Sequence, residues 1–142
     1  MTMLDDEDLQ TLQHEVQRLL GRCLLRLQQY ERLIKAMVAH HKVSGPIHDL
    51  EQTSAKQVDD TARKTLGILV GDLLGSYVVA GEIDPAEETT TNSPTGVNWF
   101  AMQLTLGLPE AELVRVESEL REMVLLRNNL VHHFIDQHDL GI

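Results

Sequence analysis

Residues 5–42, DDEDLQTLQHEVQRLLGRCLLRLQQYERLIKAMVAHHK, decide the fold because their apolar side chains recur at helical spacing. One stripe, with steps of three and four residues, runs through Leu9, Leu12, Val16, Leu19 and Cys23 and resumes at Leu27, Tyr30, Ile34, Met37 and His41. Such spacing is typical of a helix with one buried face. The acids at positions 5–8 favour a helix N-terminus through the helix dipole. We therefore predict one long helix over residues 5–42, with Cys23 in the core.

The stretch after this helix predicts further helices. Ser44-Gly45-Pro46 should end the first helix, because glycine tolerates a left-handed cap and proline lacks the amide donor. A second helix is expected from about Pro46 to about Val58, with a break or cap at Asp59-Asp60-Thr61. Residues 62–78 are apolar and carry Gly67, Gly71 and Gly75, so we expect a neighbouring helix to approach this small-residue face closely.

The remaining segments are a loop, a β-tolerant stretch and a last helix. Residues 80–97 contain two prolines and no basic residue, and predict an acidic loop. Residues 97–106 partly alternate and could pair with Tyr77-Val78-Val79, which gives a small β insertion near 76–106. The last helix should begin at Pro109 and run to about Asp136. We predict a mainly α fold, a helical bundle with one long N-terminal helix, in a single domain spanning 1–142.

Composition narrows the class of protein. Apolar residues make up 42% of the chain and aromatic residues 4%, which suits a core of aliphatic side chains between helices. No apolar run approaches the roughly 18 residues of a membrane span. The N-terminus is acidic where a signal peptide would be basic. A single cysteine, Cys23, excludes an intramolecular disulfide. These features predict a cytoplasmic protein without a membrane partner.

The charge is unevenly distributed. A net charge of −10 argues against nucleic-acid binding if it is spread evenly, but residues 18–64 hold nine Lys and Arg against five Asp and Glu. A local basic surface can attract an anionic partner in spite of an acidic total. The candidate RNA-binding residues are Arg18, Arg22, Arg26, Lys56, Arg63 and Lys64. The alternative is that these side chains only form solvent-exposed helix faces and bind no RNA.

The end of the last helix carries the residues best suited to chemistry. The segment LLRNNLVHHFIDQHDL (125–140) places Asn128, His132 and Asp136 four residues apart, on one face of an ideal helix. The long side chain of Arg127 can reach toward the same face. Imidazole can transfer a proton near neutral pH, and guanidinium can hold phosphate oxygens in two hydrogen bonds. Together they suit phosphodiester cleavage in which the RNA supplies its own 2′-hydroxyl nucleophile, without a metal.

Arg127-Asn128-x-x-x-His132 resembles the motif of the HEPN superfamily, compact helical domains many of which are metal-independent ribonucleases. The resemblance implies catalytic roles for Arg127 and His132, with Asn128 as their polar partner. It also implies a homodimer in which two motifs face one cleft. Phe134 stands where the family often has tyrosine.

A second resemblance covers more of the chain. GRCLLRLQQYERLIKAMVAHHKVSGP (21–46) with LRNNLVHHF (126–134) is similar to the N-terminal helical region of bacterial proteins that end in an OST-HTH (LOTUS) domain. That domain type is associated with RNA binding. The resemblance leaves open that residues 1–142 are the N-terminal part of a longer protein.

Several alternatives stay open at this point. The chain could be a non-catalytic dimerisation or RNA-binding module of a larger regulatory protein, or a toxin–antitoxin-type helical partner. His132 could cap a helix C-terminus, and Arg127 could pair with Glu119 or Glu122. The histidines lack the acids and the spacing of a metal site, so no metal and no cofactor are expected.

Overall fold

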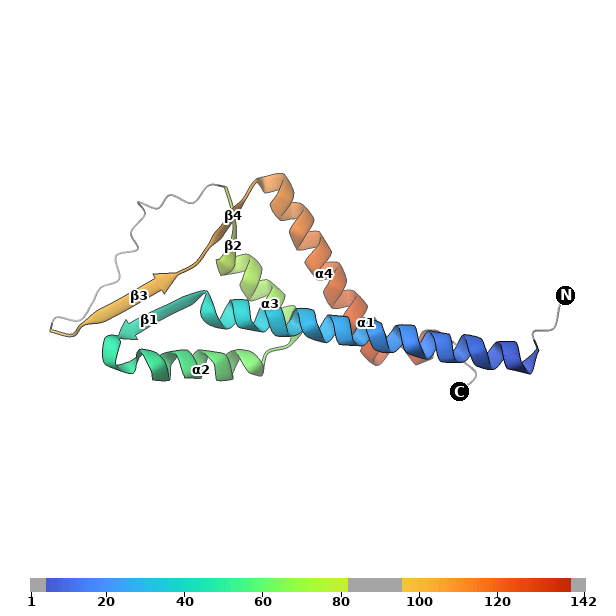
Figure 1. The fold of residues 1–142 in the computed structure, drawn as a ribbon. Coiled ribbons are helices and arrows are strands. Elements are labelled where there is room, and N and C mark those ends of the chain that lie inside the picture. The colour runs from blue at the N-terminus through green and yellow to red at the C-terminus, as the bar shows by residue number, and fades with distance from the viewer. Residues whose placement is uncertain (1–4, 82–95, 139–142) are drawn as a thin grey trace.

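The computed structural model describes residues 5–81 and 96–138, and more than half of the chain lies in helices (Figure 1). The prediction of a mainly α fold with one long N-terminal helix and a small β insertion is confirmed. The α-helices are α1 (Asp6–His40), α2 (Leu50–Ala62), α3 (Leu66–Asp72), α4 (Glu110–His132) and α5 (Phe134–Gln137).

Helix α1 is 35 residues long, and its N-terminal end projects beyond the other elements (Figure 1). Along α1 only Leu27, Ile34 and Ala39 are buried. Leu12 and Leu19, which belong to the predicted buried stripe, are 51% and 47% exposed. Cys23 is exposed as well, so its prediction as a core residue is wrong for the single chain. The stripe has helical spacing, but the described elements of the same chain do not cover its N-terminal half.

The predicted helix boundaries need two corrections. Helix α1 ends at His40, and Ser44-Gly45-Pro46 lies in strand β1 (Lys42–Pro46) instead of forming a helix cap. A short 3-10 helix, η1 (Ile47–Asp49), then leads into α2, which continues past the predicted break to Ala62. Thr61 fits inside the helix because its hydroxyl donates to the Gln57 carbonyl oxygen at 2.6 Å. The actual break lies just before Thr65, whose side chain caps α3.

A third difference from the prediction concerns the glycine face, which consists of Gly67, Gly71 and Gly75. Helix α3 continues into a π-helix, η2 (Leu73–Tyr77), and then into strand β2 (Val78–Ala80). A Cβ built on Gly67 would lie 3.7 Å from Val124 of α4, an ordinary contact, and one built on Gly71 or Gly75 would have no described neighbour within 4 Å. The expectation that a helix packs closely on all three glycines is therefore wrong within the described chain.

The β insertion consists of two two-stranded sheets. Strand β1 pairs antiparallel with β3 (Trp99–Gln103), with Gly45 opposite Phe100, and β2 pairs parallel with β4 (Leu106–Leu108), with Val78 opposite Leu106. The predicted hairpin-like pairing of 97–106 with Tyr77-Val78-Val79 is wrong for residues 99–103, which pair with β1 instead. Only the register of Leu106 with Val78 agrees with it, and that pair is parallel. A parallel pair needs a connection of about a dozen residues or more, which the chain between β2 and β4 provides. Most of the predicted 80–97 loop, residues 82–95, lies outside the described residues.

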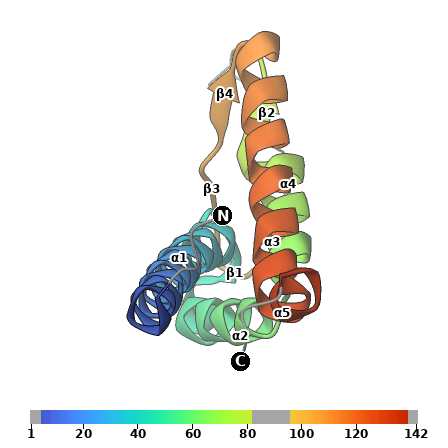
Figure 2. The ribbon, with the colours of Figure 1, turned by 90° about the vertical axis from the view of Figure 1, so that its right-hand side faces the viewer.

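The core forms where α3 packs against both α1 and α4, and Figure 2 shows α3 alongside α4. Its most buried side chains are Leu69 and Val70 of α3, and Ile34 of α1 packs in the same cluster. Leu120, Met123 and Val124 of α4 pack against this cluster. This packing holds α4 against α3 and thereby positions the last turns of α4, where the predicted site lies.

Candidate functional site

Arg127, Asn128 and His132 all lie in the last two turns of α4. Arg127 is half-buried, whereas Asn128 and His132 are exposed. The Nη1 atom of Arg127 donates to the Oδ1 atom of Asn128 at 3.4 Å. This is the only hydrogen bond recorded among the three side chains. The structure therefore joins Arg127 with Asn128 and leaves His132 accessible on the same helix end.

Arg127 differs from the other arginines of α4 in its partners. Arg115 bonds to Glu112 at 2.8 Å, and Arg121 bonds to Glu117 at 3.2 Å. Within residues 5–81 and 96–138, no carboxylate forms an ion pair with Arg127. The alternative pairing with Glu119 or Glu122 is not observed. The guanidinium can therefore bind an external anion without first breaking an ion pair to a described acid.

The end of α4 departs from the prediction. The helix stops at His132, because the backbone of His133 (φ −128°, ψ −5°) leaves the helical region. Asp136 belongs to the separate helix α5 and does not extend the face of Asn128 and His132. Asn129 donates to Gln137 at 2.8 Å and ties α5 to α4. His132 is thus the last residue of α4, so its role as a cap of the helix C-terminus stays an alternative to proton transfer.

Phe134 stands at the position where the HEPN resemblance implies a tyrosine. Its ring lies 4.7 Å from the ring of His138, centre to centre. The rings of His132 and His133 lie 6.2 Å apart, centre to centre. The helix end is thus surrounded by three exposed histidines, at positions 132, 133 and 138. His133 and His138 were not predicted as site residues, and only their nearness in sequence to His132 could have indicated them.

The predicted RNA-binding residues fall into two groups. Arg18 bonds to Glu15 through Nε at 3.0 Å, and this hydrogen bond holds the pKa of the Glu15 carboxyl below its usual value. Arg63 and Lys64 are also held by acids, Asp59 at 3.2 Å and Asp72 at 2.7 Å. By contrast, the exposed side chains of Arg22, Arg26 and Lys56 form no ion pair with any acid in the described ranges.

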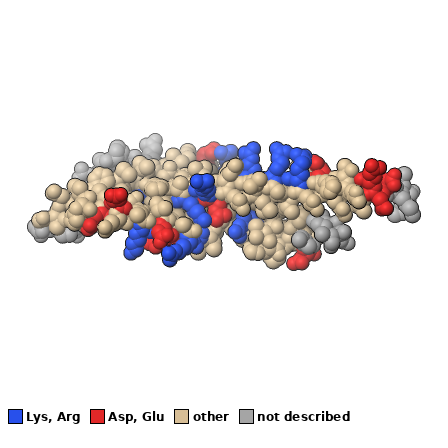
Figure 3. All heavy atoms as spheres, turned by 60° about the horizontal axis from the view of Figure 1, so that its bottom comes forward, with Lys and Arg blue, Asp and Glu red and all other residues tan. Residues whose placement is uncertain are grey.

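One face of the molecule shows two groups of basic side chains (Figure 3). Basic side chains gather in a group along one edge, and a second basic group is interleaved with acids. The N-terminal end of α1 is acidic, in agreement with Asp6, Glu7 and Asp8 in its first turn. The basic surface is therefore local, as the sequence predicts, and it lies away from the acidic helix end.

An apolar groove runs between α1 and α4 close to the predicted site. It has a volume of about 600 Å³ and is lined by Leu27, Tyr30, Glu122, Met123, Leu126 and Asn129, among others. Exposed leucines continue this apolar surface, and Leu125 and Leu126 of α4 are 70% and 50% exposed. A single chain therefore leaves a wide apolar surface open beside Arg127 and Asn128.

A second polar site was not predicted. His41 and Ser76, which are 35 residues apart in the sequence, lie within hydrogen-bonding distance at 2.9 Å. Neither residue belongs to a recognisable motif, and their contact depends on where α1 ends relative to η2. No sequence signal could have joined them.

No three His, Cys, Asp or Glu side chains within residues 5–81 and 96–138 are grouped closely enough to hold a metal ion. None of the described helices combines the length and hydropathy needed to cross a lipid bilayer. In comparisons with known proteins, no family model, curated protein or solved structure matches this chain. The HEPN and OST-HTH resemblances therefore rest on the quoted residues alone and stay predictions.

Proposed function

We propose that this protein binds RNA as a homodimer and cleaves it without a metal, with Arg127, Asn128 and His132 as the reacting site. One observation carries the proposal: Arg127 is half-buried at the end of α4, bonds to Asn128 and has no acid partner among the described residues. A guanidinium held in place but not neutralised is suited to bind a phosphate group.

The three side chains have complementary roles in this proposal. His132 takes the proton of an RNA 2′-hydroxyl, and that oxygen attacks the adjacent phosphorus atom. Arg127 holds the phosphate and offsets the charge that develops on its oxygens. Asn128 orients the phosphate through its amide. The P–O5′ bond breaks, the leaving oxygen takes a proton from water, His132 gives its proton to solvent, and a 2′,3′-cyclic phosphate remains.

The test is incubation of the full chain with mixed single-stranded RNA in EDTA. Arg127→Ala and His132→Ala should each lower the cleavage rate by about 10² to 10⁴, the usual effect of losing charge stabilisation or proton transfer. Arg121→Ala and His133→Ala are matched controls, because Arg121 is paired with Glu117 on the same helix and His133 is the exposed neighbour of His132. Both controls should retain cleavage.

The products distinguish this mechanism from a contaminating nuclease. Internal attack gives 2′,3′-cyclic phosphate ends, which mass spectrometry detects. Cleavage that survives in Arg127→Ala and His132→Ala at the wild-type rate would exclude the proposed site. Loss of helicity in both variants would show that the two residues are structural.

A second candidate function is favoured by the exposed apolar groove between α1 and α4. In this alternative the chain is a non-catalytic dimerisation or RNA-binding module of a larger regulatory protein, or a helical partner of the toxin–antitoxin type. RNA binding without any cleavage between pH 6 and pH 8 would select this alternative over the enzyme.

A further inference from the structure

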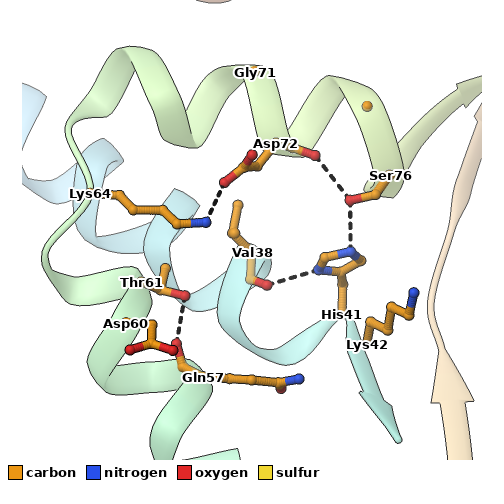
Figure 4. A pocket seen from close by; sticks show the side chains of 11 residues that line it. Val38, His41, Lys42, Gln57, Asp60, Thr61, Lys64, Gly71, Asp72 and Ser76 are labelled. Atoms are coloured by element: carbon orange, nitrogen blue, oxygen red, sulfur yellow. Dashed lines mark hydrogen bonds and ion pairs between the residues drawn. The ribbon is translucent and has the colours of Figure 1, made fainter.

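A pocket of about 450 Å³ lies between the C-terminal end of α1, α2 and the α3–η2 segment (Figure 4). Its volume falls within the range of roughly 300–1,000 Å³ that is usual for small-molecule sites. His41, Ser76, Thr61, Lys64 and Asp72 are among the polar side chains that line it. This pocket is separate from the end of α4, since no lining residue comes from that helix.

His41 is held in one orientation inside this pocket. It is 8% exposed, and its Nδ1 atom lies 2.8 Å from the carbonyl oxygen of Val38. A carbonyl oxygen can only accept, so Nδ1 carries the proton and the neutral ring keeps a lone pair on Nε2. The ring of Tyr77 lies edge-on at 5.9 Å and restricts the imidazole further. His41 is therefore a base whose accepting nitrogen points in a defined direction.

That nitrogen faces the hydroxyl of Ser76, with 2.9 Å between Nε2 and Oγ (Figure 4). Ser76 lies in the π-helix η2, a distortion of α-helical geometry that is frequent at functional sites. Its hydroxyl also lies 3.0 Å from the Asp72 carbonyl oxygen, so the single proton can be donated to either acceptor. A nucleophile, a base and a group that orients the base thus lie in one chain of hydrogen bonds.

The glycine face leaves space beside this serine. Gly71 and Gly75 line the same pocket, and a Cβ on either would have no described neighbour within 4 Å. No helix within residues 5–81 and 96–138 packs on these two glycines, and the bare backbone lets a ligand approach Ser76. Lys64 and Asp72 form an ion pair of 2.7 Å across the pocket and offset each other's charge. Lys42 and Asp60, the other charged residues that line the pocket, add one charge of each sign, so an uncharged ligand suits these walls better than an anion.

We propose that Ser76 is a nucleophile, activated by His41, that accepts the acyl group of small uncharged esters. In the first step the Ser76 hydroxyl proton moves to Nε2 of His41 while the oxygen attacks the ester carbonyl carbon. The bond to the leaving alcohol breaks, and the alcohol takes the proton from His41. Water then attacks the acyl-serine, His41 takes its proton and returns it to Ser76, and a carboxylic acid leaves. No oxidant or reductant is needed.

The test uses the full chain and p-nitrophenyl acetate. Wild type should release a burst of p-nitrophenolate stoichiometric with protein, and peptide mass spectrometry should find the acetyl group on Ser76. Ser76→Ala should lose the burst, whereas Ser118→Ala, an exposed serine on α4, should keep it. His41→Gln should slow acylation by about 10² to 10⁴. A burst of equal size in wild type and Ser76→Ala, or the absence of acetyl on Ser76, would overturn the proposal.

Because His41 is buried, circular dichroism checks that the His41→Gln variant is folded like wild type. A second measurement tests activation by His41 without replacing that residue. In a chain with Cys23→Ser and Ser76→Cys, the new thiol should react with iodoacetamide about tenfold faster than the exposed Cys23 of wild type, since a neighbouring imidazole lowers a thiol pKa. A reaction no faster than that of Cys23 would contradict activation by His41. Arg127→Ala should leave both measurements unchanged, so failure here is distinguishable from failure of the RNA proposal.

Discussion

The arginine side chains of this protein differ in whether they form an ion pair with an acid among the described residues. Arg18, Arg63, Arg115 and Arg121 each pair with an acid three or four residues away in the sequence. Such exposed pairs contribute little to folding stability, but they reduce the charge available to an anionic ligand. Arg22, Arg26, Arg32 and Arg127 have no such partner within the described ranges. Arg22, Arg26 and Arg127, which the sequence predicts to be site residues, are the ones among these that we expect to meet phosphate groups.

The first prediction concerns Arg22 and Arg26. The double charge reversal Arg22→Glu with Arg26→Glu should weaken RNA binding and flatten its salt dependence, since each lost phosphate contact lowers the slope of log K against log[salt] by roughly 0.7 for a single strand. Fluorescence anisotropy at several salt concentrations measures both effects. Arg115→Glu serves as the control, because Arg115 is already paired with Glu112. An unchanged affinity in the double variant would remove this surface from the RNA proposal.

The two candidate sites differ in how far the sequence could predict them. Arg127, Asn128 and His132 are neighbours on one helix, so their nearness follows from helical spacing alone. His41 and Ser76 meet only because α1 ends at His40 and α3 continues as a π-helix. The sequence near these two positions predicts neither event. His41 fits the apolar stripe as well as the residues before it, so nothing marks the end of α1 at His40. The residues of η2 show no spacing that distinguishes a π-helix from an α-helix. Contacts over 35 residues depend on tertiary packing.

At the level of the elements, leucines on different helices differ widely in the exposed fraction of their side chains. Leu69 of α3 is 0% exposed at the centre of the core, whereas Leu125 of α4 is 70% exposed. Leu69→Ala should lower the free energy of unfolding by about 2–5 kcal/mol, the usual effect of a cavity in a core. Leu125→Ala should change it by less than about 0.5 kcal/mol in the monomer. Urea denaturation at low protein concentration measures both, and equal effects would contradict the described core.

The glycine face allows a prediction that links stability to the pocket. Gly71→Ala should raise the free energy of unfolding by about 0.5–1 kcal/mol, because alanine favours the helix and its Cβ meets no described neighbour. The same methyl group would occupy pocket space beside Ser76, so acetylation of Ser76 should slow. Urea denaturation and the p-nitrophenolate burst check the two parts. A destabilised variant would mean that an undescribed segment or a partner covers Gly71.

The strands show where prediction from the sequence stops. Alternation over 97–106 indicates a strand, and the structure has β3 within this range and β4 beginning at its last residue. The partner of β3 could not be predicted, because β1 contains Gly45 and Pro46, which indicate a helix end or a turn. Pro46 is tolerated because it is the last residue of a strand in a two-stranded sheet, where only one side needs to be paired. Pairing between distant segments is decided by the tertiary fold.

For the whole molecule, the exposed apolar stripe of α1 is the main feature that a single chain does not explain. Leu9, Leu12 and Leu19 are each roughly half exposed on the projecting end of α1, and Leu125 and Val131 of α4 are exposed as well. Large exposed apolar surfaces commonly mark interaction sites. A second copy of the chain would cover such a stripe in a symmetric contact.

The last prediction follows from this surface. Wild type should be a dimer at micromolar concentration by light scattering, and Leu12→Glu with Leu19→Glu should convert it to a folded monomer. The control, Gln10→Glu with Gln17→Glu, adds the same two charges on the opposite side of α1, where both side chains are exposed, and should stay dimeric. If RNA cleavage requires two copies of the chain, the leucine double variant should lose both the dimer and the cleavage activity. The glutamine double variant should keep both. A monomeric wild type would exclude both the interface and a cleft shared by two Arg127–His132 sites.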